Sequence, residues 1–265
     1  MQRWLLLDIG NTQTVAAIAR PGASSGDFLR TIRFRTDPSV TADEYRLTIV
    51  QLLLTPRGAV TDGLGALPSI SRVIVSSVVP ALEPAVREAF AETPLLFVTH
   101  EAKRDFDLDL PVPSSLGADR LANAAGARVL APAPYLIVDA GTATTFCVID
   151  ARPAYIGGAI APGLEIGFRA LAARAAKLFA VELKAPASSI GNTTETQIQS
   201  GVVLAYESLI ESMADRLARD AGDSLHDATW FATGGCAHYL RLSARFRLEP
   251  RLTLIGLQRY GELNP

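Results

Sequence analysis

The sequence predicts an α/β fold made of two similar halves, and two observations carry this prediction. Residues 6–14 (LLDIGNTQT) are echoed by residues 137–145 (IVDAGTATT), about half a chain further on. In addition, segments with apolar residues at helical spacing alternate with short apolar runs that are typical of strands. Internal repetition at this spacing is expected of a fold built from two related α/β units.

Each copy of the repeat predicts a strand, a tight turn and a returning strand. Apolar residues lead to Asp8 and Asp139, and a glycine turn with hydroxyl side chains follows each carboxylate. Glycine lets the backbone approach an anion, turn N–H groups donate to phosphate oxygens, and the carboxylate binds the accompanying cation. Either loop alone is compatible with an ordinary hairpin. The duplication favours two phosphate loops that face one nucleotide cleft.

The first half of the chain alternates strands with helices. Residues 41–54 follow a candidate cap and have helical spacing, whereas residues 73–79 form a continuous apolar run closed by Pro80, as in a buried strand. The charged stretch 100–109 is the first plausible join between the halves. The expected strands of this half are 4–7, 15–19, 29–35, 73–79 and 95–99, and its expected helices are 41–54 and 82–91.

The second half repeats the hairpin and adds longer helices. A helix at 116–130 has Ser114 or Ser115 as its candidate cap. The remaining expected elements are a hairpin at 135–149, a glycine-rich turn at 155–163, helices from 164 to about 179 and at 195–221, and a short strand at 231–233 before Gly234. The predicted domains are residues 1–115 and 116–265.

Composition favours a small-molecule partner. The 265 residues are 49% hydrophobic, enough for a substantial core, and the formal net charge of −2 offers no electrostatic footprint for nucleic acid or an acidic membrane. Cys147 and Cys236 lie in no metal-binding or disulfide pattern. No apolar run suits a signal peptide or a membrane span. We therefore expect a soluble, cytoplasmic protein without nucleic-acid or membrane partners.

Four segments together resemble one family: the paired Asp loops, LGADR at 116–120, GGAIAPG at 157–163 and GNTTETQIQSG at 191–201. Their order and spacing resemble those of type III pantothenate kinases, in the acetate and sugar kinase, Hsp70 and actin superfamily. The resemblance runs from Asp8 to Gly235. It implies two RNase H-like (actin-like) lobes with mixed sheets flanked by helices around a nucleotide cleft. It also implies ATP-dependent phosphorylation of pantothenate to 4'-phosphopantothenate, the first step of coenzyme A biosynthesis.

The resemblance implies roles for the nucleotide residues. Asp8 would help to organise Mg²⁺, and Asp139 would bind a monovalent cation, K⁺ or NH₄⁺. Thr142 would be a further ATP contact in the second loop. The expected ATP-binding residues of the first loop are Asp8, Ile9, Gly10, Asn11, Thr12, Gln13, Thr14 and Val15.

The resemblance also implies a pantothenate site, formed by Gly117, Ala118, Asp119, Arg120 and Thr194. Asp119 would be the general base, which suits the need of phosphoryl transfer for a proton acceptor beside the attacking hydroxyl. Arg120 has the geometry to pair with the pantothenate carboxylate. The alternative is a capped helix start with an exposed ion pair. The family is homodimeric, which makes the helix at 195–221 a candidate dimer surface.

One position departs from the family pattern. Many members have a tyrosine that contacts pantothenate seven residues before the glycine of the GADR segment, where this chain has Leu110. Loss of that hydroxyl predicts weaker substrate binding, by about 1–2 kcal/mol. The other hypotheses are a kinase for another small hydroxy acid and a non-catalytic regulator. The presence of Asp8, Asp119, Arg120, Asp139 and Thr194 together argues against the regulator.

Overall fold

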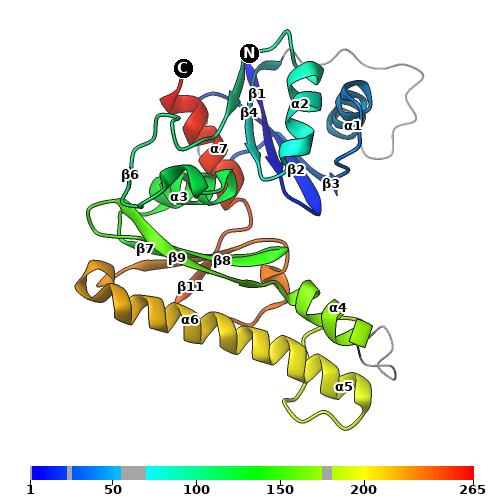
Figure 1. Ribbon diagram of the computed structural model, residues 1–265, viewed down its shortest axis with the longest axis vertical. Helices are drawn as coiled ribbons and strands as arrows, with labels where there is room; N and C mark the ends of the chain where they lie inside the picture. The colour runs from blue at the N-terminus through cyan, green and yellow to red at the C-terminus, as the bar shows by residue number, and fades with distance from the viewer. Residues whose placement is uncertain (1, 23–25, 55–69, 175–180) are drawn as a thin grey trace. The chain divides into compact units, whose positions relative to one another are not determined.

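The computed structural model describes residues 2–22, 26–54, 70–174 and 181–265, which belong to two compact units (Figure 1). Unit 1 combines Met1–Asp105, Pro111–Leu130 and Arg251–Pro265, and unit 2 combines Phe106–Leu110 with Ala131–Pro250. This division differs from the expected domains 1–115 and 116–265, because the helices at 118–130 and 252–263 pack in unit 1. Among the described helices, none is long and apolar enough to cross a membrane.

Unit 1 contains a five-stranded mixed sheet in the order β3-β2-β1-β4-β5. The strands are β1 (Arg3–Ile9), β2 (Gln13–Ala19), β3 (Arg30–Arg35), β4 (Ile70–Ser77) and β5 (Leu95–Phe97). β1 and β2 are antiparallel, as are β2 and β3, whereas β4 runs parallel to β1 and β5 parallel to β4. The predicted first hairpin is therefore confirmed.

Helices cover both faces of this sheet. On one face, α1 (Ala42–Leu54) and α2 (Glu83–Ala89), which follows a 3₁₀ turn at Pro80–Leu82, pack on alternate residues of β1, β2 and β4. α1 begins with reciprocal hydrogen bonds, because the Glu44 N–H donates to Thr41 Oγ1 (3.3 Å) and the Thr41 N–H donates to the Glu44 carboxylate (3.0 Å). On the other face, α7 (Leu252–Leu263) contacts β1 and β4, and α3 (Ala118–Leu130) contacts β4.

α3 and α7 cross with their backbones in contact. A Cβ atom added to Gly256 would lie 1.8 Å from the Ala122 carbonyl oxygen, and one added to Gly126 would lie 2.2 Å from the Leu252 carbonyl oxygen. Only glycine permits this approach. The crossing is fastened at its side by Thr253, whose hydroxyl donates to Asn123 Oδ1 at 2.8 Å.

Unit 2 contains a six-stranded mixed sheet in the order β11-β10-β7-β8-β9-β6. The strands are β6 (Asp107–Leu108), β7 (Tyr135–Ala140), β8 (Ala143–Ile149), β9 (Ala154–Pro162), β10 (Thr229–Thr233) and β11 (Phe246–Leu248). The order β9-β8-β7-β10-β11 has the same parallel and antiparallel pairings as β3-β2-β1-β4-β5. The prediction of two similar α/β halves is therefore confirmed, and β6 is an addition at the β9 edge.

One nearly continuous helix covers a face of the second sheet. It consists of α5 (Thr194–Gln199), a π-helical turn at Ser200–Leu204 and α6 (Ala205–Ala221), and Figure 1 shows α6 lying along the sheet. Tyr206, Ile210 and Ala214 of α6 pack on β7 and β8. The predicted helix at 195–221 is confirmed, with the π turn as an unpredicted feature.

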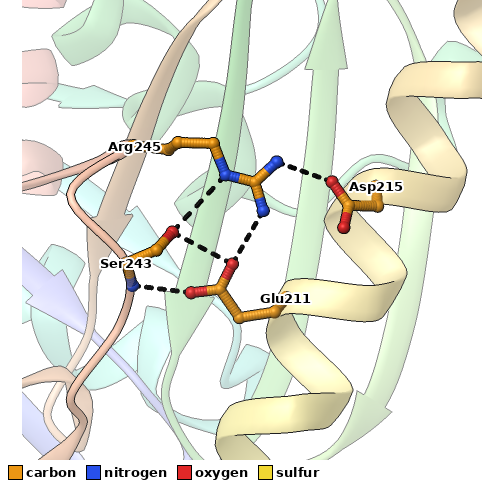
Figure 2. A network of polar contacts seen from close by, with 4 residues as sticks. All are labelled: Glu211, Asp215, Ser243 and Arg245. Atoms are coloured by element: carbon orange, nitrogen blue, oxygen red, sulfur yellow. Dashed lines mark hydrogen bonds and ion pairs between the residues drawn. The ribbon is translucent and has the colours of Figure 1, made fainter.

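Polar contacts bind α6 to the connection between β10 and β11 (Figure 2). Arg245 donates to Asp215 Oδ1 at 2.7 Å and to Glu211 Oε2 at 2.9 Å, and the Ser243 N–H donates to Glu211 Oε1 at 2.6 Å. The Arg245 guanidinium also lies over the Trp230 ring, 4.4 Å from its centroid. The acidic face of α6 is therefore covered by residues of the same chain.

The predicted glycine-rich turn at 155–163 is wrong, because this segment forms β9. A Cβ atom added to Gly158 would lie 1.7 Å from the Phe146 carbonyl oxygen, so the glycine permits close strand pairing rather than a reversal. Ser114 and Ser115 do not cap α3, because they belong to a 3₁₀ turn and the helix begins at Ala118.

α4 (Leu164–Arg174) confirms the start of the helix expected from residue 164, and the expected residues 175–179 lie outside the described ranges. β6, β11 and α7 were not predicted from the sequence.

We expect Gly256→Ala to destabilise the protein by about 3 kcal/mol, because its methyl group would overlap the α3 backbone, which has no side chain to move aside. Chemical denaturation measures the change in the free energy of unfolding. Gly167→Ala in α4 is the matched control, because nothing lies within 4 Å of its added Cβ and alanine favours the helix. Equal stability of the two variants would contradict the proposed role of the crossing.

Candidate active site

The two units divide the predicted site residues between them. Unit 1 contains the first loop and the GADR segment, and unit 2 contains Leu110, Asp139, Thr142 and Thr194. The predicted general base and the first phosphate loop are therefore in the same unit, which the expected domain boundary had separated.

The first loop joins β1 to β2 through Gly10, Asn11 and Thr12. Asn11 and Thr12 are exposed, and the Gly10 N–H donates to the Gln13 carbonyl at 3.1 Å, which closes the turn. Asp8 lies in β1, two residues before the turn, and is half-buried. Because the side chains of Ile9 and Thr14 are buried, only their backbones are available to a ligand at the loop.

Two buried hydroxyl groups hold the first loop from its core side. The Thr36 hydroxyl donates to the Gly10 carbonyl at 2.7 Å and lies 2.9 Å from Thr14 Oγ1. Since Thr36 has one hydroxyl hydrogen, Thr14 is the donor in the second contact. The Thr36 N–H also donates to the Thr12 carbonyl at 3.1 Å. These bonds fix the turn in one conformation before any ligand arrives.

The second loop has the same framework with a turn one residue shorter. Asp8 pairs with Val15 across the first hairpin, seven positions on, and Asp139 pairs with Thr145 across the second, six positions on. The Gly141 N–H donates to the Ala143 carbonyl at 3.2 Å, and Thr142 is exposed at the turn. The structure therefore confirms that the sequence repeat is a repeat of conformation.

Glycines surround the Asp139 carboxylate. Gly234, at φ +96°, follows β10, and a Cβ atom added there would lie 2.4 Å from Asp139 Oδ1. A Cβ atom added to Gly141 would lie 3.4 Å from the same oxygen. The turn after β10 thus lies against the carboxylate expected to bind a cation.

A buried hydroxyl stands beside each carboxylate. Ser76 on β4 pairs with Asp8, and Thr145 on β8 pairs with Asp139, so each hydroxyl projects from the same face of the sheet as its carboxylate. Both hydroxyl oxygens are buried and have no hydrogen-bond partner among the described residues. A carboxylate beside a hydroxyl supplies the oxygen ligands that Mg²⁺ and K⁺ prefer, either directly or through bound water. Both positions therefore fit a cation.

Within the described ranges, no three His, Cys, Asp or Glu residues are grouped so as to hold a metal ion. A single carboxylate such as that of Asp8 fits Mg²⁺ that is held together with substrate phosphates and water, as is common for this ion.

The GADR segment folds back on itself at the start of α3. Asp119 Oδ1 accepts the Arg120 N–H at 2.8 Å, and it would lie 2.5 Å from a Cβ atom on Gly117. Arg120 Nη2 donates to the Ser115 carbonyl at 3.4 Å. Both side chains are half-buried against Gly117. Asp119 and Arg120 therefore form no ion pair with each other, and the predicted alternative of an exposed pair is not what the structure has.

Leu110 and Thr194 lie at element ends in unit 2. Leu110 follows β6, which the Asp109 N–H fastens to β9 by donating to the Tyr155 carbonyl at 3.0 Å. Thr194 is the exposed first residue of α5, after the capping residue Thr193, whose hydroxyl accepts the Thr196 N–H. Sequence reasoning named these positions but missed Thr36 and Ser76, which lie in no motif, and gave no role to Thr145, the last residue of the second repeat copy.

Comparison with known proteins gives one family. A family model described as type III pantothenate kinase matches residues 4–216. The type III pantothenate kinase of Streptomyces coelicolor is 35% identical over 98% of this chain and 98% of its own length. That of Thermomicrobium roseum is 40% identical over 96% of this chain and 95% of its own length.

Solved structures share the fold at low identity. A structure described as a Baf family transcriptional activator from Campylobacter jejuni has a TM-score of 0.60 at 18% identity, covering 98% of both chains. Component A of (R)-2-hydroxyglutaryl-CoA dehydratase from Acidaminococcus fermentans has 0.55 at 12% identity over 100% of both. MreB5 of Spiroplasma citri has 0.53 at 10% identity, over 97% of this chain and 95% of its own. The predicted fold class, actin-like lobes with mixed sheets flanked by helices, is confirmed.

We expect Gly234→Ala to destabilise the protein by more than the roughly 1–3 kcal/mol of backbone strain that its positive φ implies, because the methyl group would also overlap Asp139 Oδ1. Gly157→Ala is the matched control, since φ is +137° there and nothing lies within 4 Å of the added Cβ. Urea denaturation of both variants separates strain from contact. Equal losses would mean that Gly234 does not constrain Asp139.

Proposed function

The chain belongs to the type III pantothenate kinase family, and we propose from this premise how its residues share the reaction. The protein is a kinase that transfers phosphate from ATP to pantothenate in coenzyme A biosynthesis. The observation that supports the division of roles is that the family match includes both phosphate loops, each on the same strand-turn-strand framework.

The first loop binds the ATP phosphates. Its exposed turn offers the Asn11 and Thr12 side chains and backbone N–H groups, and Thr36 holds it rigid from the core side. Mg²⁺ bound with ATP would neutralise charge on the transferred phosphate. Asp8 would hold that ion through a carboxylate oxygen or through water, and the buried Ser76 hydroxyl beside it would add a further oxygen.

The second loop contributes a nucleotide contact at Thr142 and a monovalent cation site at Asp139. A large, weakly hydrated ion such as K⁺ suits a single carboxylate flanked by backbone and hydroxyl oxygens. The buried Thr145 hydroxyl beside Asp139 supports this assignment. We therefore expect turnover to depend on K⁺ or NH₄⁺.

Asp119 accepts the proton of the pantothenate hydroxyl as it attacks the γ-phosphate. Its Oδ1 receives the Arg120 N–H, so we assign Oδ2 to the substrate hydroxyl. The Arg120 guanidinium pairs with the pantothenate carboxylate, and Thr194 contacts the substrate. A proton acceptor held in this way contributes typically about 10²- to 10⁴-fold in rate.

In a homodimer formed through the helix at 194–221, one face of α6 is available for contact with the partner subunit. The face with Glu211 and Asp215 is covered by residues 241–245 (Figure 2). The exposed residues of the π turn and α6 along another face include Gly201, Ala205, Ser208, Ser212 and Arg216. Apart from Arg216, these residues have small side chains, which suit close helix packing with a partner. A cytoplasmic location remains a prediction.

A non-catalytic regulator is the less supported function. The structure described as a transcriptional activator is 18% identical and supports the fold alone, whereas relatives at 35% and 40% identity are named as kinases.

We expect ADP release from ATP and Mg²⁺ to depend on pantothenate and to collapse when Na⁺ replaces K⁺ or NH₄⁺. A coupled assay of the purified protein measures both effects. Asp119→Asn should lower kcat by about 10²- to 10⁴-fold while leaving ATP affinity unchanged, whereas the exposed Asp43→Asn in α1 should match the wild type. Turnover without pantothenate would indicate another acceptor, and full activity of Asp119→Asn would remove the assigned base.

We expect Leu110→Tyr to lower KM for pantothenate by about 5- to 30-fold with little change in kcat, because it adds one hydrogen-bonding hydroxyl to substrate binding. Leu110→Phe is the matched control that adds the ring alone. Steady-state kinetics at saturating ATP separates the two. If both variants behave alike, the hydroxyl does not reach the substrate.

A further inference from the structure

A closed set of hydrogen bonds lies under the second phosphate loop. Tyr206 Oη is 2.6 Å from Thr144 Oγ1, and the Thr144 hydroxyl donates to the Pro162 carbonyl at 3.2 Å. Because Thr144 has one hydroxyl hydrogen, Tyr206 is the donor in their contact. The Leu164 backbone N–H also interacts with the Tyr206 oxygen. The contacts thus run from Leu164 through Tyr206 and Thr144 back to Pro162.

This set encloses the point where α4 meets the loop. Gly163, between Pro162 and Leu164, is so close to the turn that an added Cβ would lie 2.3 Å from the Thr142 carbonyl oxygen and 2.4 Å from that of Gly141. The start of α4 is therefore in contact with the turn that carries the nucleotide contact. Any change in the Pro162 to Leu164 geometry moves that turn.

The two hydroxyl-bearing residues of the set are buried, whereas the loop that they support is not. Thr144 is 0% exposed and Tyr206 6%, while Thr142 and Ala143 are exposed. Burial raises the pKa of Tyr206 to about 12, so its phenol remains a hydrogen donor at neutral pH. A two-residue turn has few contacts of its own, and its N–H groups bind an anion well only when they are held in place beforehand.

The first loop has an equivalent support, which argues for a role in ligand binding. Thr14 and Thr144 are each the second residue of the strand after the turn. Each contributes a buried hydroxyl to a bond beneath its loop, Thr14 with Thr36 and Thr144 with Tyr206. The partners come from different elements, so the shared feature is the buried hydroxyl under an exposed phosphate loop.

We propose that Tyr206 is a positioning residue for nucleotide binding, which holds the second phosphate loop in its binding conformation through Thr144 and the Pro162–Leu164 junction. The proposal rests on the proposed function of the loop. The π turn at Ser200–Leu204 ends two residues before Tyr206 and changes the rotation of its side chain relative to Thr194 on the same helix.

Tyr206→Phe removes only the hydroxyl and leaves the ring in the core. We expect it to raise the Kd for Mg·AMPPNP, a non-hydrolysable ATP analogue, by about tenfold, with KM for pantothenate unchanged. Isothermal titration calorimetry measures the nucleotide, and kinetics measures the split between the two substrates. Tyr239→Phe, at a side chain 42% exposed, is the control and should bind as the wild type does.

Thr144 supplies a second, independent pair of variants. Thr144→Val, of similar shape, should weaken nucleotide binding as Tyr206→Phe does, and Thr144→Ser should retain it. The double variant Tyr206→Phe/Thr144→Val should be no worse than either single variant, because both break one set of bonds.

Nucleotide affinity within twofold of the wild type in both Tyr206→Phe and Thr144→Val, with a lower melting temperature only, would overturn the proposal and leave a structural contact. The readout is separate from turnover. A wild type that binds Mg·AMPPNP but does not phosphorylate pantothenate would contradict the proposed function and leave the positioning role standing.

Discussion

The contact between Gly126 and Gly256 is the constraint on which unit 1 depends. It allows α3 and α7 to cross backbone to backbone, and the pair then covers the face of the sheet from which Asp8 projects. α3 begins with the GADR segment, so this crossing determines where Asp119 lies relative to the sheet. A side chain at either glycine would push the two helices apart and displace the whole of α3, including its first residues. The position of the proposed catalytic residue Asp119 therefore depends on a packing contact made by residues without side chains.

The repeated topology explains why these two helices are partners. α3 follows β5, the last strand of the first sheet, and α7 follows β11, which occupies the same place in the second. They are thus equivalent elements of the two halves, although both pack in unit 1. A boundary drawn from chain order separates α3 from the half that it completes and assigns α7 to the wrong unit. The unit to which a helix belongs is determined by its contacts, because a buried helix packs where its apolar surface is covered.

Sequence reasoning predicted those elements whose patterns are local. The hairpins, α1 and the helix at 194–221 carry their periodicity in their own residues. It failed for β9, because glycines that serve close strand pairing read as a turn, and for α7, which is buried around most of its circumference and shows no polar stripe. The predicted site residues Asp8, Asp119 and Asp139 lie in motifs that can be recognised in the sequence. Thr36, Ser76 and Tyr206 reach the loops from elements distant in sequence, so only the fold identifies them.

The two loops illustrate how an exposed turn that is proposed to bind an anion can be held in place. An exposed turn of two or three residues that presents N–H groups to a ligand has few left for its own stability, beyond the one at Gly10 or Gly141 that closes each turn. The fixing bonds therefore come from the buried side, where water does not compete and an unmade hydrogen bond is costly. In unit 1 a single threonine, Thr36, reaches the Gly10 carbonyl directly. In unit 2 the shorter turn packs against Gly163, and Tyr206 of α6 supports this junction through its hydrogen bond with Thr144. The two halves thus share the exposed loop, whereas each holds it through different contacts.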